Sequence, residues 1–183
     1  MSDTLANRYP RSLRILHWVR AGLVLSLIAA GWTMTGLPDA AAVKFTVFYP
    51  WHKSFGVLVV AIVLVQLAIR SQSTLPHPPA ALPRHERVLS EMVHRTMYLL
   101  LIVVPLMGYA MSSSYTESDG VFFFGMHLPE LLPKNDARFR VFQWLHSTLA
   151  YTLLGLIALH VAGALKHRFL DRDRSADVLP RMF

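Results

Sequence analysis

The stretch QWLHSTLAYTLLGLIALH, residues 143–160, contains no charged side chain and carries one histidine near each end. A helix needs about 20 mostly apolar residues to cross a bilayer core, and apolar residues continue this stretch toward the C-terminus. We therefore expect residues 141–166 to form a membrane-spanning helix. A neutral imidazole is costly to bury in hydrocarbon without a partner, so His146 and His160 each need one.

Three further stretches have a similar apolar character, in agreement with the composition of the chain. Hydrophobic residues make up 54% of the 183 residues, and the mean hydropathy is +0.39, values above those of soluble domains. The predicted spans are residues 14–36, 48–70, 93–113 and 141–166. Lys53 and Pro105, inside the second and third spans, are both tolerated in membrane helices. The sequence predicts an all-α integral membrane four-helix bundle forming one domain over residues 1–183.

The N-terminal segment admits a second interpretation. Basic residues up to Arg20, the apolar stretch after them and the small residues at 39–42 are also typical of a secretory signal peptide. The length of the apolar stretch favours a retained helix instead. His17 favours it too, because a discarded segment has no reason to carry a histidine at the depth of those in the fourth span.

The basic residues predict the orientation of the bundle, because Lys and Arg collect in cytoplasmic loops. With four spans, both termini and the loop at 71–92 share one side, which holds thirteen of the eighteen Lys and Arg residues. The remaining five are Lys44, Lys53, Lys134, Arg138 and Arg140. This bias places both termini in the cytoplasm. Since the basic residues surround apolar segments, the net charge of +7 indicates topology and not nucleic-acid binding.

Cysteine is absent from the sequence. This excludes structural disulfides, thiolate iron–sulfur clusters, zinc sites built on cysteine and covalent haem attachment through CxxCH. Any redox centre must be held by other side chains, of which histidine is the strongest candidate.

The histidines of the predicted spans fall at two membrane depths. His146 and His160 are fourteen residues apart, about 1400° of helical rotation and about 21 Å of rise, so both rings leave nearly the same face at opposite ends of the helix. His17 begins the first span and shares the cytoplasmic level with His160. His52 begins the second span and shares the outer level with His146.

Two facing imidazoles can each give a ring nitrogen to the iron of a haem between helices, while the other nitrogen donates to a carbonyl or to water. The alternative is that each histidine hydrogen-bonds across helices or lies at the interface. The agreement of four histidines in depth and helical phase favours haem ligation.

Neighbouring residues support the same interpretation weakly. Gly56 and Gly163 follow His52 and His160 by four and three residues, so each lies on a ligand face where a flat porphyrin could approach. Helix packing also uses small residues at such positions. Arg20, near His17 on the first span, could contact a haem propionate or snorkel to the interface.

The chain resembles the bacterial cytochrome b561 family, four-helix membrane proteins with two b-type haems. The resemblance rests on RYPRSLRILHW (8–18), WHKSFG (51–56), HRTMYLLLIVVPLMGY (94–109) and WLHSTLAYTLLGLIALHVAGALKHRF (144–169). It implies two haem b groups per chain and a bacterial inner membrane location, with four axial ligands. These are His17 and His160 for the inner haem, and His52 and His146 for the outer haem.

The resemblance also implies a reaction, because similar family members are superoxide oxidases that pass electrons to ubiquinone. Lys53 beside His52 could attract superoxide, as could Lys134, Arg138 and Arg140, although these cations could equally form a solvated rim. His94 and His167 lie at the cytoplasmic level and could bind the quinone and transfer protons to it.

Three other functions remain open. The protein could be the cytochrome b subunit of a dehydrogenase or hydrogenase, taking electrons from a protein partner. It could be an electron carrier without its own substrate. Outside redox chemistry, it could be a transporter lined by histidines. The aromatic run VFFFG at 121–125 could contact a partner or anchor the outer loop at the interface.

Overall fold

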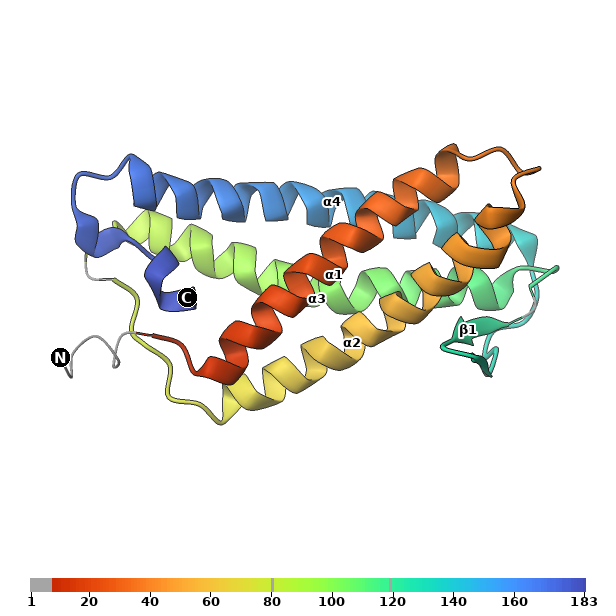
Figure 1. Cartoon of the computed structure of the whole chain (residues 1–183), viewed down its shortest axis with the longest axis horizontal. Helices are drawn as coiled ribbons and strands as arrows, with labels where there is room; N and C mark the ends of the chain where they lie inside the picture. The colour runs from red at the N-terminus through yellow and green to blue at the C-terminus, as the bar shows by residue number, and fades with distance from the viewer. Residues whose placement is uncertain (1–7, 80, 119) are drawn as a thin grey trace.

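The computed structural model describes residues 8–79, 81–118 and 120–183, and four long helices dominate it (Figure 1). They are α1 (Arg11–Gly36), α2 (Tyr49–Ser71), α3 (Arg84–Ser114) and α4 (Asp136–Phe169). A π-helix, η1 (Lys44–Phe48), leads directly into α2, and two short 3-10 helices, η2 (Arg174–Ala176) and η3 (Leu179–Met182), follow α4. All four long helices are long and apolar enough to cross a membrane, which confirms the predicted all-α membrane bundle.

The helices extend beyond the predicted spans, most of all in α3, which begins nine residues earlier at Arg84. The first part of α3 is too polar to be included in a predicted membrane span, but it is helical in the structure. Pro83 immediately before it suits a helix start, because proline lacks the N–H that a first turn leaves unpaired. At the start of α4 the side chain of Asn135 accepts the backbone N–H of Arg138 at 3.0 Å, the usual N-cap arrangement. Helices α3 and α4 are therefore longer than the apolar segments from which their membrane spans were predicted.

The helices pack in a chain, with α1 against α2, α2 against α3, and α3 extensively against α4. The buried centre consists mainly of β-branched and leucine side chains: Val24, Val59, Val63, Leu100, Leu101, Val104 and Leu153. Pro105 lies inside α3 without ending the helix. Most other apolar side chains of the spans are partly or fully exposed, as expected where the solvent is lipid.

The two ends of the bundle carry different elements (Figure 1). One end holds the C-terminus, the beginning of α1 and the α2–α3 connection; the opposite end holds the α1–α2 connection and the hairpin between α3 and α4. We name these the inner and outer ends, after the predicted orientation. The assignment of the inner end to the cytoplasm stays a prediction from the basic residues.

The outer end contains a small antiparallel hairpin that the sequence analysis did not predict. Strand β1 (Val121–Phe123) pairs with β2 (Met126–Leu128), with Val121 opposite Leu128. Phe124 and Gly125 form the turn with positive φ angles of 46° and 94°, which glycine adopts readily. Strands of three residues are too short to show the alternation of apolar and polar residues that predicts a strand, and here they lie in an aromatic run.

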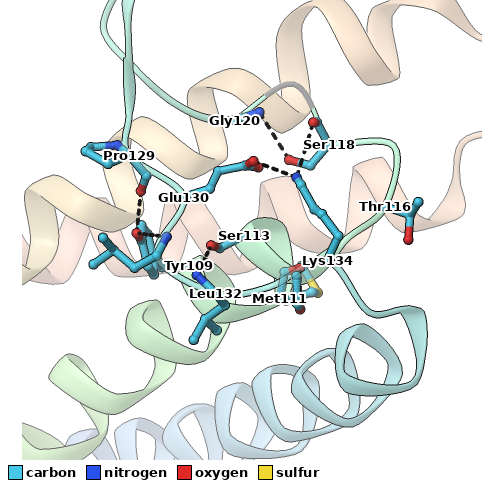
Figure 2. Close-up of polar contacts among 12 residues, drawn as sticks. Tyr109, Met111, Ser113, Thr116, Ser118, Gly120, Pro129, Glu130, Leu132 and Lys134 are labelled. Carbon is cyan, nitrogen blue, oxygen red and sulfur yellow. Dashed lines mark hydrogen bonds and ion pairs between the residues drawn. The ribbon is translucent and has the colours of Figure 1, made fainter.

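The hairpin is attached to α2 and the outer loop is attached to α3. Ser54, fully buried on α2, accepts the N–H of Phe124 at 3.1 Å. Figure 2 shows the second attachment, where the Tyr109 hydroxyl donates to the carbonyl of Pro129 and Ser113 accepts the N–H of Leu132 at 3.0 Å. Polar side chains near the helix ends thus satisfy backbone groups of the loop.

The C-terminal residues fold back over the inner end. The indole of Trp18 donates to the carbonyl of Met182 at 3.0 Å, and its ring lies 5.1 Å from that of Phe183. Arg181 donates to the carbonyl of His77 in the α2–α3 connection at 2.7 Å. The tail therefore links α1 to this connection beside His17, whose ring is 5.2 Å from Trp18.

Candidate functional site

The outer histidines come together from two helices. His52 lies in the first turn of α2 and His146 lies on α4, and their ring centroids are 6.1 Å apart with an interplanar angle of 79°. The Nδ1 atom of His146 lies 2.9 Å from the carbonyl oxygen of Val104 on α3. With the proton on Nδ1, this hydrogen bond fixes the ring and leaves Nε2 free to bind a metal.

A glycine allows α3 to approach His146. A Cβ atom at Gly108 would lie 3.1 Å from both Cε1 and Nδ1 of the His146 ring, closer than side chains normally pack. Gly108 stands one turn after Val104, so the hydrogen bond and the close approach involve the same face of α3. The sequence analysis missed Gly108; its position one turn beyond Pro105 on a predicted membrane helix is the signal that could have indicated a close contact.

His52 has an unusual environment for a polar ring. Its Nδ1 atom is buried and has no hydrogen-bond partner among the residues that the structure describes. Buried polar atoms without partners are rare in folded proteins, and each calls for an explanation. A buried ring that has such a nitrogen and lies beside a second histidine suits metal ligation.

The inner histidines also come together. His17 on α1 and His160 on α4 have ring centroids 6.3 Å apart with an interplanar angle of 61°. A third ring, that of His94 on α3, lies 4.9 Å from His160, and its Nδ1 lies 2.6 Å from the carbonyl oxygen of Ser90. Three helices therefore contribute histidines at this level.

The ring separations can be compared with the requirement of a shared metal ion. A ring nitrogen lies about 2 Å from a metal that it binds and the ring centre about 1 Å further, so imidazoles on opposite sides of one ion have centroids about 6 Å apart. The observed separations are 6.1 Å and 6.3 Å. Both centroid separations therefore match the separation expected of two imidazoles that share one metal ion.

Two glycines leave room on the helix faces that carry His52 and His160. A Cβ atom built at Gly56 or at Gly163 would meet no heavy atom of the described chain within 4 Å. These glycines therefore leave open space on the faces that carry His52 and His160. Arg20, the other expected haem contact, is buried near His17, with its guanidinium 3.4 Å from the Nδ1 atom of that histidine.

His167 lies in a charged cluster with three other side chains and not against the His160 ring. Its Nδ1 atom is 2.7 Å from Asp171, and its Nε2 atom is 3.7 Å from Glu86. Ligand atoms of Glu86, His167 and Asp171 lie within 4.8 Å of one another, but the Lys166 ammonium pairs with both carboxylates. The hydrogen bond from His167 holds the pKa of Asp171 below its ordinary value of 3.8. Because the cluster contains its own cations, it has no need of a metal ion.

Two of the outer basic residues, Lys53 and Lys134, contact the outer loop. Lys53 donates to the carbonyl of Gly120 at 3.2 Å, which holds its ammonium against the segment before β1. Lys134 forms an ion pair with Glu130 at 2.6 Å (Figure 2). This hydrogen bond from Lys134 keeps the pKa of Glu130 below its ordinary value of 4.5. Part of the outer positive charge is thus neutralised locally.

Four membrane-length helices with two histidine pairs near opposite ends are the arrangement expected of a multi-pass membrane protein that binds haem. A sequence model of the prokaryotic cytochrome b561 family matches residues 8–183, and the chain belongs to this family. It is therefore a multi-pass protein of the bacterial inner membrane, and membership implies haem b binding and membrane electron transfer.

Similar proteins include two from Escherichia coli (strain K12) and one from Yersinia pestis. Cytochrome b561 homolog 2 is 28% identical over 182 residues, covering 96% of this chain and 90% of the relative. Cytochrome b561 homolog 1 is 22% identical and covers 92% of this chain and 94% of the relative. The Yersinia protein, named "Probable superoxide oxidase CybB", is 26% identical and covers 87% of this chain and 88% of the relative.

Proposed function

We propose that the protein carries electrons across the membrane between two bis-histidine haems b, from superoxide at the outer face to ubiquinone near the inner haem. His52 and His146 ligate the outer haem, and His17 and His160 ligate the inner one. The observation that carries the proposal is the pair of ring separations, 6.1 Å and 6.3 Å, each suited to one shared iron. Haem b supplies a reversible one-electron couple at each level.

The ligand assignment explains the features of the outer pair. Hydrogen bonding of His146 Nδ1 to Val104 orients the ring and leaves Nε2 available to bind the iron. Two histidines on one haem iron would leave it no open position, so superoxide would give up its electron at the haem edge and would not bind the metal. Fourteen residues of α4 separate the two levels by about 21 Å, which suits one-electron steps between two fixed groups.

The reaction balances with two superoxide anions for each quinone. Each anion loses one electron and becomes dioxygen, and ubiquinone takes both electrons with two protons to become the quinol. The name of the Yersinia relative supports superoxide as the donor. Lys53, next to His52 in the chain, supplies a positive charge at the outer level, positioned by its hydrogen bond to Gly120.

His94 and His167, the inner histidines outside the ligand pairs, have separate roles in the proposed quinone reduction. The contact of His94 with the His160 ring, and the hydrogen bond of its Nδ1 to Ser90, leave Nε2 for a quinone oxygen. His167 lies between Asp171 and Glu86 at the predicted cytoplasmic interface. We assign quinone contact to His94 and proton supply to His167, because carboxylates on both sides of the imidazole suit a proton relay.

The test is rapid mixing of the oxidised, detergent-purified protein with superoxide, followed by haem absorbance and then by quinol formation after ubiquinone is added. We expect haem reduction well above the uncatalysed background. Lys53→Gln, which removes the charge, should slow reduction about 3-fold to 10-fold at low salt, and the difference should shrink at high salt.

Two controls separate charge from structure. Lys53→Arg keeps the charge and should keep the rate, whereas Lys134→Gln removes an outer-loop ammonium that is not adjacent in the chain to a proposed haem ligand and should have the smaller effect. Haems that superoxide does not reduce would eliminate the superoxide proposal and favour a subunit that takes electrons from a protein partner. A protein without haem after expression in haem-sufficient cells would remove the ligand assignment and favour a transporter.

A further inference from the structure

A buried cation lies next to the inner histidines. Arg20 lies on the membrane-spanning helix α1, and this charged residue is only 8% exposed. Its guanidinium donates to the side-chain oxygen of Gln66 on α2 at 2.6 Å and lies 5.1 Å from the centre of the Tyr98 ring on α3. The same group is 3.4 Å from Nδ1 of His17. Side chains from three helices therefore hold this charge in one position.

Within the described part of the chain, Arg20 has no carboxylate counter-ion of the kind that a buried charge normally has. Among the residues that the structure describes, no carboxylate oxygen lies within the 4.0 Å of an ion pair with this guanidinium. Arginine stays protonated even when buried, so a full positive charge persists here. Gln66 and Tyr98 offer a neutral oxygen and an aromatic face, which compensate desolvation only in part.

Gln66, the hydrogen-bond partner of Arg20, lies on α2 at the inner-end position that corresponds to His52 at the outer end. Gln66 stands fourteen residues after His52 on α2, the spacing that separates the two ligands of α4. Fourteen residues return nearly to the same helix face about 21 Å along the axis. The inner end of the ligand face of α2 therefore carries Gln66, itself 4% exposed, which orients a cation toward the inner pair.

The outer pair has different polar neighbours. The hydrogen bond of His146 goes to the neutral carbonyl of Val104. Lys53, the cation next to His52 in sequence, donates to the carbonyl of Gly120 in the outer loop. The two pairs thus share their ring separation, but Arg20 contacts a histidine of the inner pair, whereas Lys53 contacts the outer loop.

We infer that Arg20 raises the reduction potential of the inner haem above that of the outer haem, and so directs electrons inward. The inference rests on the ligand assignment in the proposed function. A fixed positive charge in a low-dielectric interior favours the state with one more electron. The sign is the same if the guanidinium instead neutralises a haem carboxylate, because removal of Arg20 then leaves that negative charge uncompensated.

The test is a spectropotentiometric titration of single-haem proteins. His146→Ala retains the inner haem and His160→Ala retains the outer one, so each midpoint potential can be assigned. We expect the inner midpoint to lie above the outer one. Arg20→Gln in the His146→Ala background should lower the inner midpoint, Arg20→Lys should retain most of it, and Arg20→Gln in the His160→Ala background should leave the outer midpoint unchanged.

The outcomes are separate from those of the proposed function. An inner midpoint at or below the outer one overturns the inference even if Arg20→Gln prevents haem binding, since that comparison needs no Arg20 variant. An inner midpoint unaffected by Arg20→Gln also overturns it. Neither result depends on superoxide or ubiquinone turnover, and a protein without haem would refute the ligand assignment instead.

Discussion

The inner and outer histidine pairs have nearly the same ring separation but different surroundings. The outer pair has a neutral carbonyl as its polar partner and an unpartnered nitrogen on His52. The inner pair has a third histidine in ring contact and the guanidinium of Arg20 close by. The fourteen-residue repeat on α4 therefore reproduces the geometry of a ligand pair, while α1, α2 and α3 determine its electrostatic environment.

The two ends of the bundle also differ in how they are closed. The hairpin at the outer end is attached through Ser54 of α2. At the inner end the C-terminal tail is attached through Trp18 of α1. Backbone segments from distant parts of the chain thus close the two ends in different ways.

The largest expected effect is loss of one haem from either end. We expect wild type to bind two haems b per chain, and His146→Ala and His160→Ala to bind one each, because each substitution leaves one iron with a single axial ligand. The measurement is the ratio of haem to polypeptide from pyridine haemochrome spectra. Loss of both haems in either variant would show that the pairs are not independent.

Substitution of Gly108 should have an intermediate effect, and it tests the outer histidine pair separately from the inner pair. Gly108→Ala places a methyl group 3.1 Å from the His146 ring, and such overpacking costs about 1–3 kcal/mol. We expect lower outer-haem occupancy and a lower unfolding temperature, with inner-haem content unchanged. Haem spectra and thermal unfolding measure these effects.

The matched control is Gly155→Ala on α4, where a Cβ atom meets no described heavy atom within 4 Å. Alanine there should be neutral or stabilise the helix by about 0.5–1 kcal/mol. Equal behaviour of the two variants would contradict the close approach of α3 to His146.

The smallest expected effect concerns the outer loop and depends on pH. Glu130→Gln removes the ion pair with Lys134 and should lower the free energy of unfolding by about 0.2–1 kcal/mol at pH 7, the range for partly exposed pairs. The pKa of Glu130 is lowered in the folded protein by the hydrogen bond from Lys134. Its contribution is therefore fully present above its unfolded pKa and is lost as pH falls through the folded pKa.

Thermal unfolding of wild type and Glu130→Gln between pH 3 and pH 7 measures this dependence. The difference between them should disappear at the acidic end. Asp173→Asn at the inner end provides the control. The pKa of Asp173 is also lowered, but by hydrogen bonds with Ser175 and not by a lysine. A difference for Glu130→Gln that persists unchanged at low pH would exclude the ion pair as its cause.

The sequence by itself determined the number of membrane helices and the pairing of the histidines by depth. Apolar length fixes a span, and the helical rotation of 100° per residue fixes which side chains share a face. Both properties are local to one helix, so they can be read along the chain. His17 with His160, and His52 with His146, follow from this reasoning alone, and the structure brings both pairs together.

The tertiary structure decided what surrounds each pair, because these contacts depend on how the helices are rotated against one another and on which rotamers fit between them. Spacing alone did not indicate that Gly108 lies against His146 or that Gln66 and Tyr98 hold Arg20. It placed His167 at the inner interface but did not predict its carboxylate partners. Depth along a helix is set by sequence position, whereas partners across helices are set by packing.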